Sequence, residues 1–165
     1  MTSRTQSLVF ALAIGAVAAS AVHGQQRQRI PTYAELRGEG IFSSGRSTTL
    51  AGGGVVVPAG NYTRVSVDAE LGAEMQSSET RVAGRVDLVA RFLLDPLREM
   101  PWGISLGGGL SVPYGQGQRG VQPLMTAVID VEGRRGRRFT PALQVGLGGG
   151  TRVALVFRAS PSAWR

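Results

Sequence analysis

The chain has 165 residues, no cysteine and no lysine, and its 18 arginines against 11 acidic residues give a net charge of +7. This length suits one domain, and the absence of cysteine excludes disulfides, thiolate chemistry and a lipid-attachment cysteine. A basic chain raises the question of nucleic-acid binding, but most of the excess arginine falls in predicted turns and tails, so we expect no nucleic-acid partner.

The first 24 residues are typical of a secretory signal peptide. Arg4 supplies a positive charge ahead of an apolar run over 8–22, which is too short for an ordinary membrane-spanning helix. Compact residues before Gln25 then indicate a cleavage site, although an uncleaved membrane anchor is the alternative. We therefore predict a signal peptide over 1–24 and a polar leader over 25–31, followed by one domain over 32–158 and a C-terminal tail over 159–165.

Two stretches, 64–75 and 81–92, alternate apolar side chains with charged or small ones at a period of two. Because side chains of a strand point alternately to opposite faces, each stretch predicts a ribbon with one apolar and one ionic side. Each is about as long as a tilted membrane-crossing strand, roughly 9–11 residues. The pattern favours a barrel wall with lipid outside and polar contents inside. An amphipathic hairpin of a soluble β-sandwich has the same period.

Turn-forming residues divide the chain into eight candidate strands, and their short connections make sequential strands antiparallel neighbours. Pro141 cannot donate to a strand ladder, so we expect it at a strand start or a bulge. The predicted fold is all-β, a single up-and-down antiparallel eight-stranded transmembrane β-barrel. In chain order, the predicted strands cover 32–43, 47–57, 64–75, 81–92, 102–112, 122–132, 139–149 and 151–158.

The strand faces opposite the apolar rows hold eight acids and seven arginines, and the apolar rows hold no charge. An isolated ion in a low-dielectric interior is costly, so these ions must pair. Since an eight-stranded barrel is just wide enough for side chains to fill it, we predict a lumen plugged by an ionic network, with glycines of 102–112 and 139–149 making room. The predicted network comprises Glu35, Arg37, Glu39, Arg64, Asp68, Glu70, Glu74, Arg81, Arg85, Asp87, Arg91, Asp130, Glu132, Arg152 and Arg158.

The charges also restrict the register of the hairpin over 64–92. In one register Glu70 faces Arg85 and Glu74 faces Arg81, and in another Glu74 faces Arg85. The register between these two sets Glu70 against Asp87, a like-charge pair that we expect the chain to avoid. The first two registers remain open.

On this pattern of strands, turns and inward charges, the chain resembles the small eight-stranded bacterial outer-membrane β-barrel proteins over residues 32–158. The resemblance implies export, insertion by the barrel-assembly machinery and residence among the lipids of the bacterial outer membrane, and we expect a monomer. It also implies that both ends of the barrel chain face the periplasm. The turns near 45, 76–80, 114–120 and 148–151 would then face outward.

Catalysis is poorly supported. The one histidine, His23, lies in the predicted signal peptide, which excludes Ser-His and Cys-His nucleophiles and most zinc sites from the mature chain. Glu35 and Glu39 lie on one strand face roughly 13 Å apart, farther than the glycosidase spacings of about 5–9.5 Å. We expect no enzyme, no cofactor and no metal.

The sequence therefore predicts a non-enzymatic outer-membrane barrel with a structural or interaction role in the cell envelope. One alternative is a narrow, porin-like passive channel, which needs a continuous water path past Arg37, Arg85 and Asp87. The other is a secreted soluble β-sandwich or lipocalin-like binding protein, with Val67, Leu88 and their apolar neighbours turned into a dry core.

Overall fold

The computed structural model describes residues 32–77, 79–94, 101–115, 122–134 and 139–159. These residues belong to the second of two compact units of the chain, Pro31–Arg165. The predicted signal peptide and polar leader lie outside the described residues, as does the predicted tail beyond residue 159.

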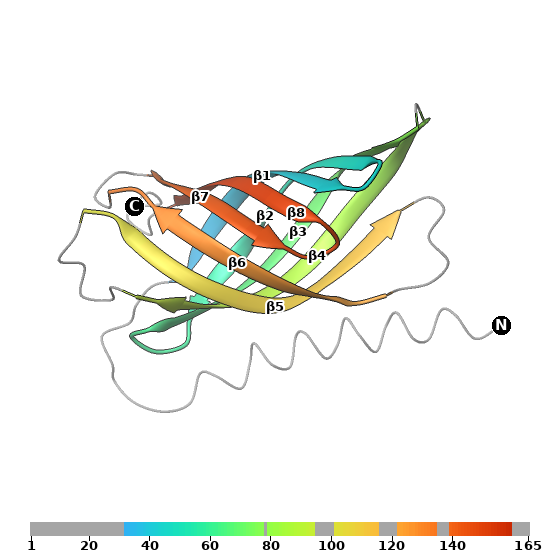
Figure 1. Ribbon diagram of the computed structural model, residues 1–165. Helices are drawn as coiled ribbons and strands as arrows, with labels where there is room; N and C mark the ends of the chain where they lie inside the picture. The colour runs from blue at the N-terminus through green and yellow to red at the C-terminus, as the bar shows by residue number, and fades with distance from the viewer. Residues whose placement is uncertain (1–31, 78, 95–100, 116–121, 135–138, 160–165) are drawn as a thin grey trace. The chain divides into compact units, whose positions relative to one another are not determined.

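The eight strands form a closed antiparallel barrel in which every strand pairs with its neighbour in sequence and β8 closes on β1 (Figure 1). This confirms the predicted all-β, up-and-down, eight-stranded architecture. Among the described residues, no helix is long and apolar enough to cross a membrane. The strands are β1 Tyr33–Ser43, β2 Arg46–Pro58, β3 Thr63–Gln76, β4 Glu79–Leu93, β5 Gly103–Gly115, β6 Leu124–Glu132, β7 Phe139–Leu147 and β8 Thr151–Ala159.

Turn chemistry separates the strands where the sequence indicated. Gly45 between β1 and β2 has φ 73°, and Gly149 between β7 and β8 has φ 77°, a backbone region that glycine enters without steric cost. Pro141 is the third residue of β7, and pairing of β7 with β6 begins only at Ala142. The proline therefore lies at the strand start, as predicted, where β6 does not require its missing N–H.

The register of β3 with β4 is the one that places Glu70 opposite Arg85 and Glu74 opposite Arg81. The same register also sets Asp68 opposite Asp87, a like-charge pair that destabilises an isolated hairpin. Closure of the barrel offsets this cost, because these two aspartates find arginines on other strands across the lumen. The hairpin register therefore depends on ion pairs with other strands of the barrel. A comparison of charges within the hairpin alone could not include them.

We call the end of the barrel with the β1–β2, β3–β4 and β7–β8 turns the turn end, and the end where β1 starts and β8 finishes the terminal end. β4 pairs with β5 only from Ala83 onward, so residues 79–82 have no partner on that side among the described residues. Figure 1 shows the β3–β4 hairpin, in green, projecting past the other strands at the turn end.

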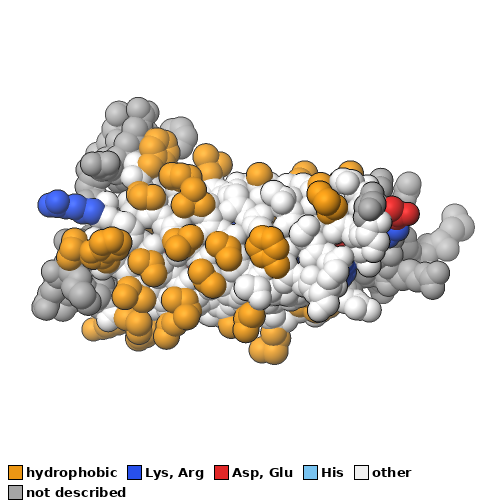
Figure 2. All heavy atoms as spheres, turned by 45° about the horizontal axis from the view of Figure 1, so that its top comes forward, with side chains coloured by type: hydrophobic (Ala, Val, Ile, Leu, Met, Phe, Trp, Pro, Cys, Tyr) orange, Lys and Arg blue, Asp and Glu red, His pale blue; other side chains and the backbone are white. Residues whose placement is uncertain are grey.

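The outer surface of the barrel is apolar. The strand positions that alternate with the buried ones expose large hydrophobic side chains, among them Leu36 and Leu88, and Leu88 is 48% exposed at mid-barrel. In Figure 2, hydrophobic side chains spread over the barrel wall, and the charged side chains that are plainly visible lie at its ends. Val67, Leu71 and Phe92 also face outward, so the apolar core of the soluble β-sandwich alternative does not form.

Aromatic side chains gather at the terminal end of the barrel. Tyr62 and Phe92 stack with ring centroids 5.9 Å apart, and Trp102, directly before β5, and Phe139 and Phe157 in strands are exposed near the same end. Amphipathic rings in such a belt suit the boundary between hydrocarbon and lipid headgroups.

Candidate functional site

The lumen of the barrel is filled by charged side chains. Seven carboxylates and six guanidinium groups among the described residues are less than one-tenth exposed, and all thirteen belong to the network that the sequence predicted. They come from β1, β3, β4, β6 and β8. The buried set comprises Glu35, Arg37, Glu39, Arg64, Asp68, Glu70, Arg85, Asp87, Arg91, Asp130, Glu132, Arg152 and Arg158.

Two residues of the predicted network, Glu74 and Arg81, do not join it, and this part of the prediction is corrected. Arg81 lies on the projecting part of the β3–β4 hairpin, where its side chain is 44% exposed and pairs with Glu79 at 2.5 Å. Glu74 is partly exposed and lies 3.9 Å from Arg46. Although Glu74 and Arg81 are opposite each other in register, the hairpin extends beyond the closed barrel there. Arg81 therefore pairs with Glu79 on the hairpin itself, and Glu74 lies in the wall of a cavity at the turn end rather than in the buried network.

Arg37 is the centre of the network. Its Nε lies 3.0 Å from Glu70, its Nη1 lies 3.2 Å from Asp68, and its Nη2 donates to Glu39 at 3.2 Å. The same Nη2 donates to the side-chain oxygen of Gln144 at 2.8 Å. One guanidinium thus links β1, β3 and β7, and the five donors of arginine allow this multiple pairing. Arg85 is opposite Glu70 in the register of β3 and β4. The guanidinium group 3.0 Å from the Glu70 carboxylate is nevertheless that of Arg37.

Towards the terminal end, Arg158 joins carboxylates of two strands. Its Nε lies 3.1 Å from Glu35 and its Nη1 lies 2.5 Å from Glu132, and it also contacts Asp130. Arg91 reaches the same Glu35 at 3.3 Å. Ion pairs in this cluster connect β8, β4, β1 and β6, so they cross the lumen rather than follow one hairpin.

Arg64 completes the terminal side of the network. Its Nη1 lies 2.5 Å from Glu132, and its guanidinium carbon is 5.6 Å from the centroid of the Tyr33 ring. This cation–π contact places an aromatic ring against the last ion pair of the lumen. Sequence reasoning did not assign Tyr33, although its place directly ahead of the β1 charges was a usable signal.

Towards the turn end, Arg152 binds Glu39 through two nitrogens and also contacts Asp87. Its Nη1 donates to the Thr126 hydroxyl at 2.9 Å. Arg85 is less fully partnered, since its Nη2 donates to the carbonyl oxygen of Gly148 at 3.2 Å. Thr126 and Gln144 were missed in the sequence because a neutral hydrogen-bonding side chain gives no charge pattern, but both alternate in phase with the inward rows.

Space for these long side chains comes from the strands without inward charge. On the inner face of β5, glycine or serine occupies 103, 105, 107, 109 and 111, and β2 has glycine at 52 and 54. A Cβ on Gly54 would collide with the Asp68 carboxylate, and one on Gly107 would lie 3.0 Å from the side chain of Arg91. Glycines of β5 and β7 were predicted to make room in the lumen. Glycines of β2 make room there as well.

Three carboxylates, Glu39, Glu70 and Asp87, have oxygens that all lie within 4.8 Å of one another. Oxygen ligands of this kind suit hard cations. Guanidinium groups already hold the three, with Arg37 on Glu39 and Glu70 and Arg152 on Glu39 and Asp87. All three carboxylates are thus held in ion pairs, and each of the two arginines is shared between two of them.

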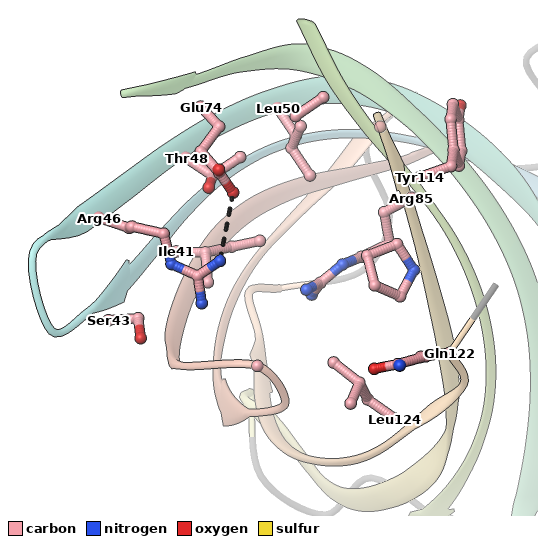
Figure 3. A pocket seen from close by; sticks show the side chains of 14 residues that line it. Ile41, Ser43, Arg46, Thr48, Leu50, Glu74, Arg85, Tyr114, Gln122 and Leu124 are labelled. Atoms are coloured by element: carbon pink, nitrogen blue, oxygen red, sulfur yellow. Dashed lines mark ion pairs between the residues drawn. The ribbon is translucent and has the colours of Figure 1, made fainter. Parts of the chain in front are cut away.

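A cavity of about 450 Å³ opens above this network at the turn end. Arg85 lies in its wall, together with Arg46, Glu74 and apolar side chains of several strands (Figure 3). Below the cavity the barrel is occupied by the buried ionic side chains. The arrangement holds fixed, compensated charge across the lumen beneath one open vestibule.

No protein-family model matches the chain, and no curated protein sequence matches it. Among solved structures, the crystal structure of the N-terminal β-barrel domain of Pseudomonas aeruginosa OprF is similar with a TM-score of 0.49 and 11% sequence identity, covering 77% of this chain and 96% of that one. The KdgM porin is similar with a TM-score of 0.26 and 14% identity, covering 79% of this chain and 99% of that one.

Proposed function

We propose that this chain is a membrane-spanning β-barrel of the bacterial outer membrane, with a structural or interaction role in the cell envelope that involves neither an enzymatic reaction nor a cofactor. The observation that carries the proposal is the sidedness of the wall. Charged side chains such as Arg37 and Asp68 are buried inside, while leucines and valines such as Leu88 and Val67 face outward. In water this distribution is unfavourable, since it exposes a broad apolar surface and buries ions.

A lipid environment reverses this balance, because hydrocarbon solvates the outward rows and the closed barrel satisfies the backbone groups that lipid cannot. The aromatic belt at the terminal end supports the same surroundings. We propose that the chain inserts among outer-membrane lipids as a monomer with the help of the barrel-assembly machinery, and that the turn end faces outward.

The plugged lumen favours this structural role over a passive channel. Arg37, Arg85 and Asp87, past which a conducting path would have to run, are buried, and Arg37 and Asp87 are held in ion pairs. Moving an ion through would require these pairs to part in a low-dielectric interior, where leaving a charge unpaired is costly.

The membrane proposal is tested by expressing residues 25–165, refolding them in detergent and comparing unheated with boiled samples on a gel. We expect the unheated barrel to migrate differently, because a folded membrane barrel resists denaturation until heated. A compact monomer that remains in solution without detergent would contradict the proposal.

The structural role is tested separately in planar lipid bilayers. We expect no discrete conductance steps after insertion, which is verified independently by co-sedimentation with vesicles. Regular steps that scale with salt concentration would favour the channel and would leave the membrane proposal intact.

A further inference from the structure

The vestibule at the turn end has the size and lining of a ligand site. Its volume of about 450 Å³ falls within the range of small-molecule pockets, about 300–1,000 Å³. Ile41, Leu50, Leu124 and Tyr114 contribute apolar wall. Such a cavity buries the apolar part of a ligand and leaves its orientation to the few polar groups that project into it.

Arg85 is a buried charged group in the wall of the vestibule whose donors are only partly used. The residue is only 4% exposed, and its Nη2 has a single hydrogen bond, to the carbonyl oxygen of Gly148. Its Nε and Nη1 have no hydrogen-bond partner. The carboxylate of Glu39 lies 3.8 Å from Nη1, and the same carboxylate oxygen is already bound by Arg152. Buried donors without acceptors are costly, and Arg85 lines the cavity, so an oxyanion bound there would lie beside a guanidinium group that lacks a full set of partners.

A second guanidinium enters the vestibule from the opposite wall. Figure 3 shows Arg46 and Arg85 pointing into the cavity from two sides. Arg46 is 3.9 Å from Glu74, too far for a hydrogen bond, so its donors are not committed to that carboxylate. The charged lining residues, two arginines and one glutamate, leave one positive charge in excess.

We propose that this vestibule binds a small organic anion, a carboxylate or phosphate attached to an apolar body, with the oxyanion held between Arg85 and Arg46. Guanidinium groups recognise such oxyanions through paired hydrogen bonds. The apolar part of the ligand lies against Ile41, Leu50 and Leu124. The site lies above the plug, so binding does not depend on whether the lumen conducts.

The test uses the full mature barrel folded in a neutral maltoside detergent, with benzoate and phenyl phosphate as probes and benzamide as the uncharged analogue of benzoate. We expect both anions to shift the backbone amide signals of Gly148 and Gly149 in NMR spectra, without shifting Gly103 at the terminal end. Benzamide should bind at least about tenfold more weakly, because the charge-assisted hydrogen bonds are lost. Equal binding of benzoate and benzamide would overturn the proposal, as would anion-induced shifts spread outside the vestibule.

Variants assign the binding to the two guanidinium groups. Arg85→Gln should weaken benzoate binding at least about tenfold, and Arg85→Lys, which keeps the charge without the forked geometry, should weaken it less. Arg81→Gln is the matched control, because it removes the same charge at the same end from a side chain that pairs with Glu79 outside the cavity. Equal losses in Arg81→Gln and Arg85→Gln would mean general attraction to a basic end and would refute the site.

The Arg85→Gln variant could fail to fold, and the gel mobility of the unheated sample would reveal this. In that case Arg46→Gln provides the test. Arg46→Gln removes a side chain that is 43% exposed and has no part in the plug, so folding should survive. We expect it to weaken benzoate binding about threefold, the smaller effect of a partly solvated charge. Unchanged affinity in this variant would exclude Arg46 from the site and contradict the two-sided arrangement.

Discussion

Arg158 contacts three carboxylates from two other strands, Glu35 of β1 and the pair Asp130 and Glu132 of β6. Its burial means that solvent cannot replace these partners. The charge of such a residue is therefore part of how the barrel closes, since β8 is the last strand and must meet β1. Without this charge, Glu35 would still have Arg91 and Glu132 would still have Arg64, but each of the three carboxylates would lose a cation.

Arg158→Leu should destabilise the folded barrel by about 3–5 kcal/mol, because it removes a shared cation from three buried carboxylates. The free energy of unfolding is measured by urea titration of protein folded in lipid vesicles. The double variant Arg158→Leu with Asp130→Asn should lose less than the sum of the two single changes, since each removes the other's partner. Strict additivity would show that Arg158 and Asp130 do not interact energetically.

Leu88→Arg tests the outward face at mid-barrel. Leu88 lies opposite Val67 of β3 and Leu110 of β5, and an arginine facing the bilayer midplane should cost about 2–4 kcal/mol of folding free energy. Val82→Arg is the matched control, because Val82 is also outward and exposed but lies before the pairing of β4 with β5 begins at Ala83. Its cost should be near the interfacial value of about 0–1 kcal/mol. Equal costs in urea titrations would contradict the assignment of Leu88 to the membrane interior.

At the scale of the strand, β5 is a spacer between two charged neighbours. Its inner row is glycine and serine while its outer row carries Ile104, Leu106 and Leu110. The strand thus contributes apolar surface outside and almost no volume inside, which leaves the lumen to the arginines of β4 and β8. A small barrel requires this division, because the interior of an eight-stranded barrel is just wide enough to be filled by side chains. Large inward side chains on every strand would not fit.

Two adjacent glycines of β5 provide a matched test of this division. A Cβ at Gly109 would collide with the backbone of Leu88 and Val89, whereas one at Gly108 would meet only the Thr126 carbonyl oxygen, at 3.4 Å. Gly109→Ala should therefore destabilise by about 1–3 kcal/mol through overpacking, and Gly108→Ala should change stability by less than about 0.5 kcal/mol. Urea titration in vesicles measures both, and similar values for the two variants would refute the role of the inner glycine row.

The strands and their sidedness could be predicted from sequence because the period-two pattern is local. Each inward charge follows from alternation within one strand, so thirteen of the fifteen predicted network residues are buried inside the barrel. Glu74 and Arg81 obey the same alternation but lie where the β3–β4 hairpin extends past the neighbouring strands. The length of a hairpin relative to the rest of the barrel cannot be read from the alternation within one strand. The role of Gln144 and the vestibule could not be predicted for a similar reason, since both depend on which strands meet across the lumen.

On the scale of the whole molecule, charge is distributed unevenly between interior and ends. The chain carries +7, yet the buried set of the described residues has seven acids against six arginines, a balance of −1. The positive excess therefore lies outside the plug, and Arg81 and Arg134 are described residues of this kind, exposed near the two ends. If the barrel spans a membrane as proposed, exposed arginines beside an apolar band would meet lipid phosphates.

The depth of the wall in the bilayer can be measured with tryptophan as the probe. Trp102 is 61% exposed at the terminal end, and in a Trp164→Phe background it is the single tryptophan of the chain. We expect lipids brominated near the headgroup to quench Trp102 most strongly, because an indole in the aromatic belt lies at the interface. In Leu88→Trp with Trp102 and Trp164 both changed to Phe, the strongest quenching should come from bromine near the acyl-chain ends. The same quenching profile at both positions would mean that the barrel does not cross the bilayer along its axis.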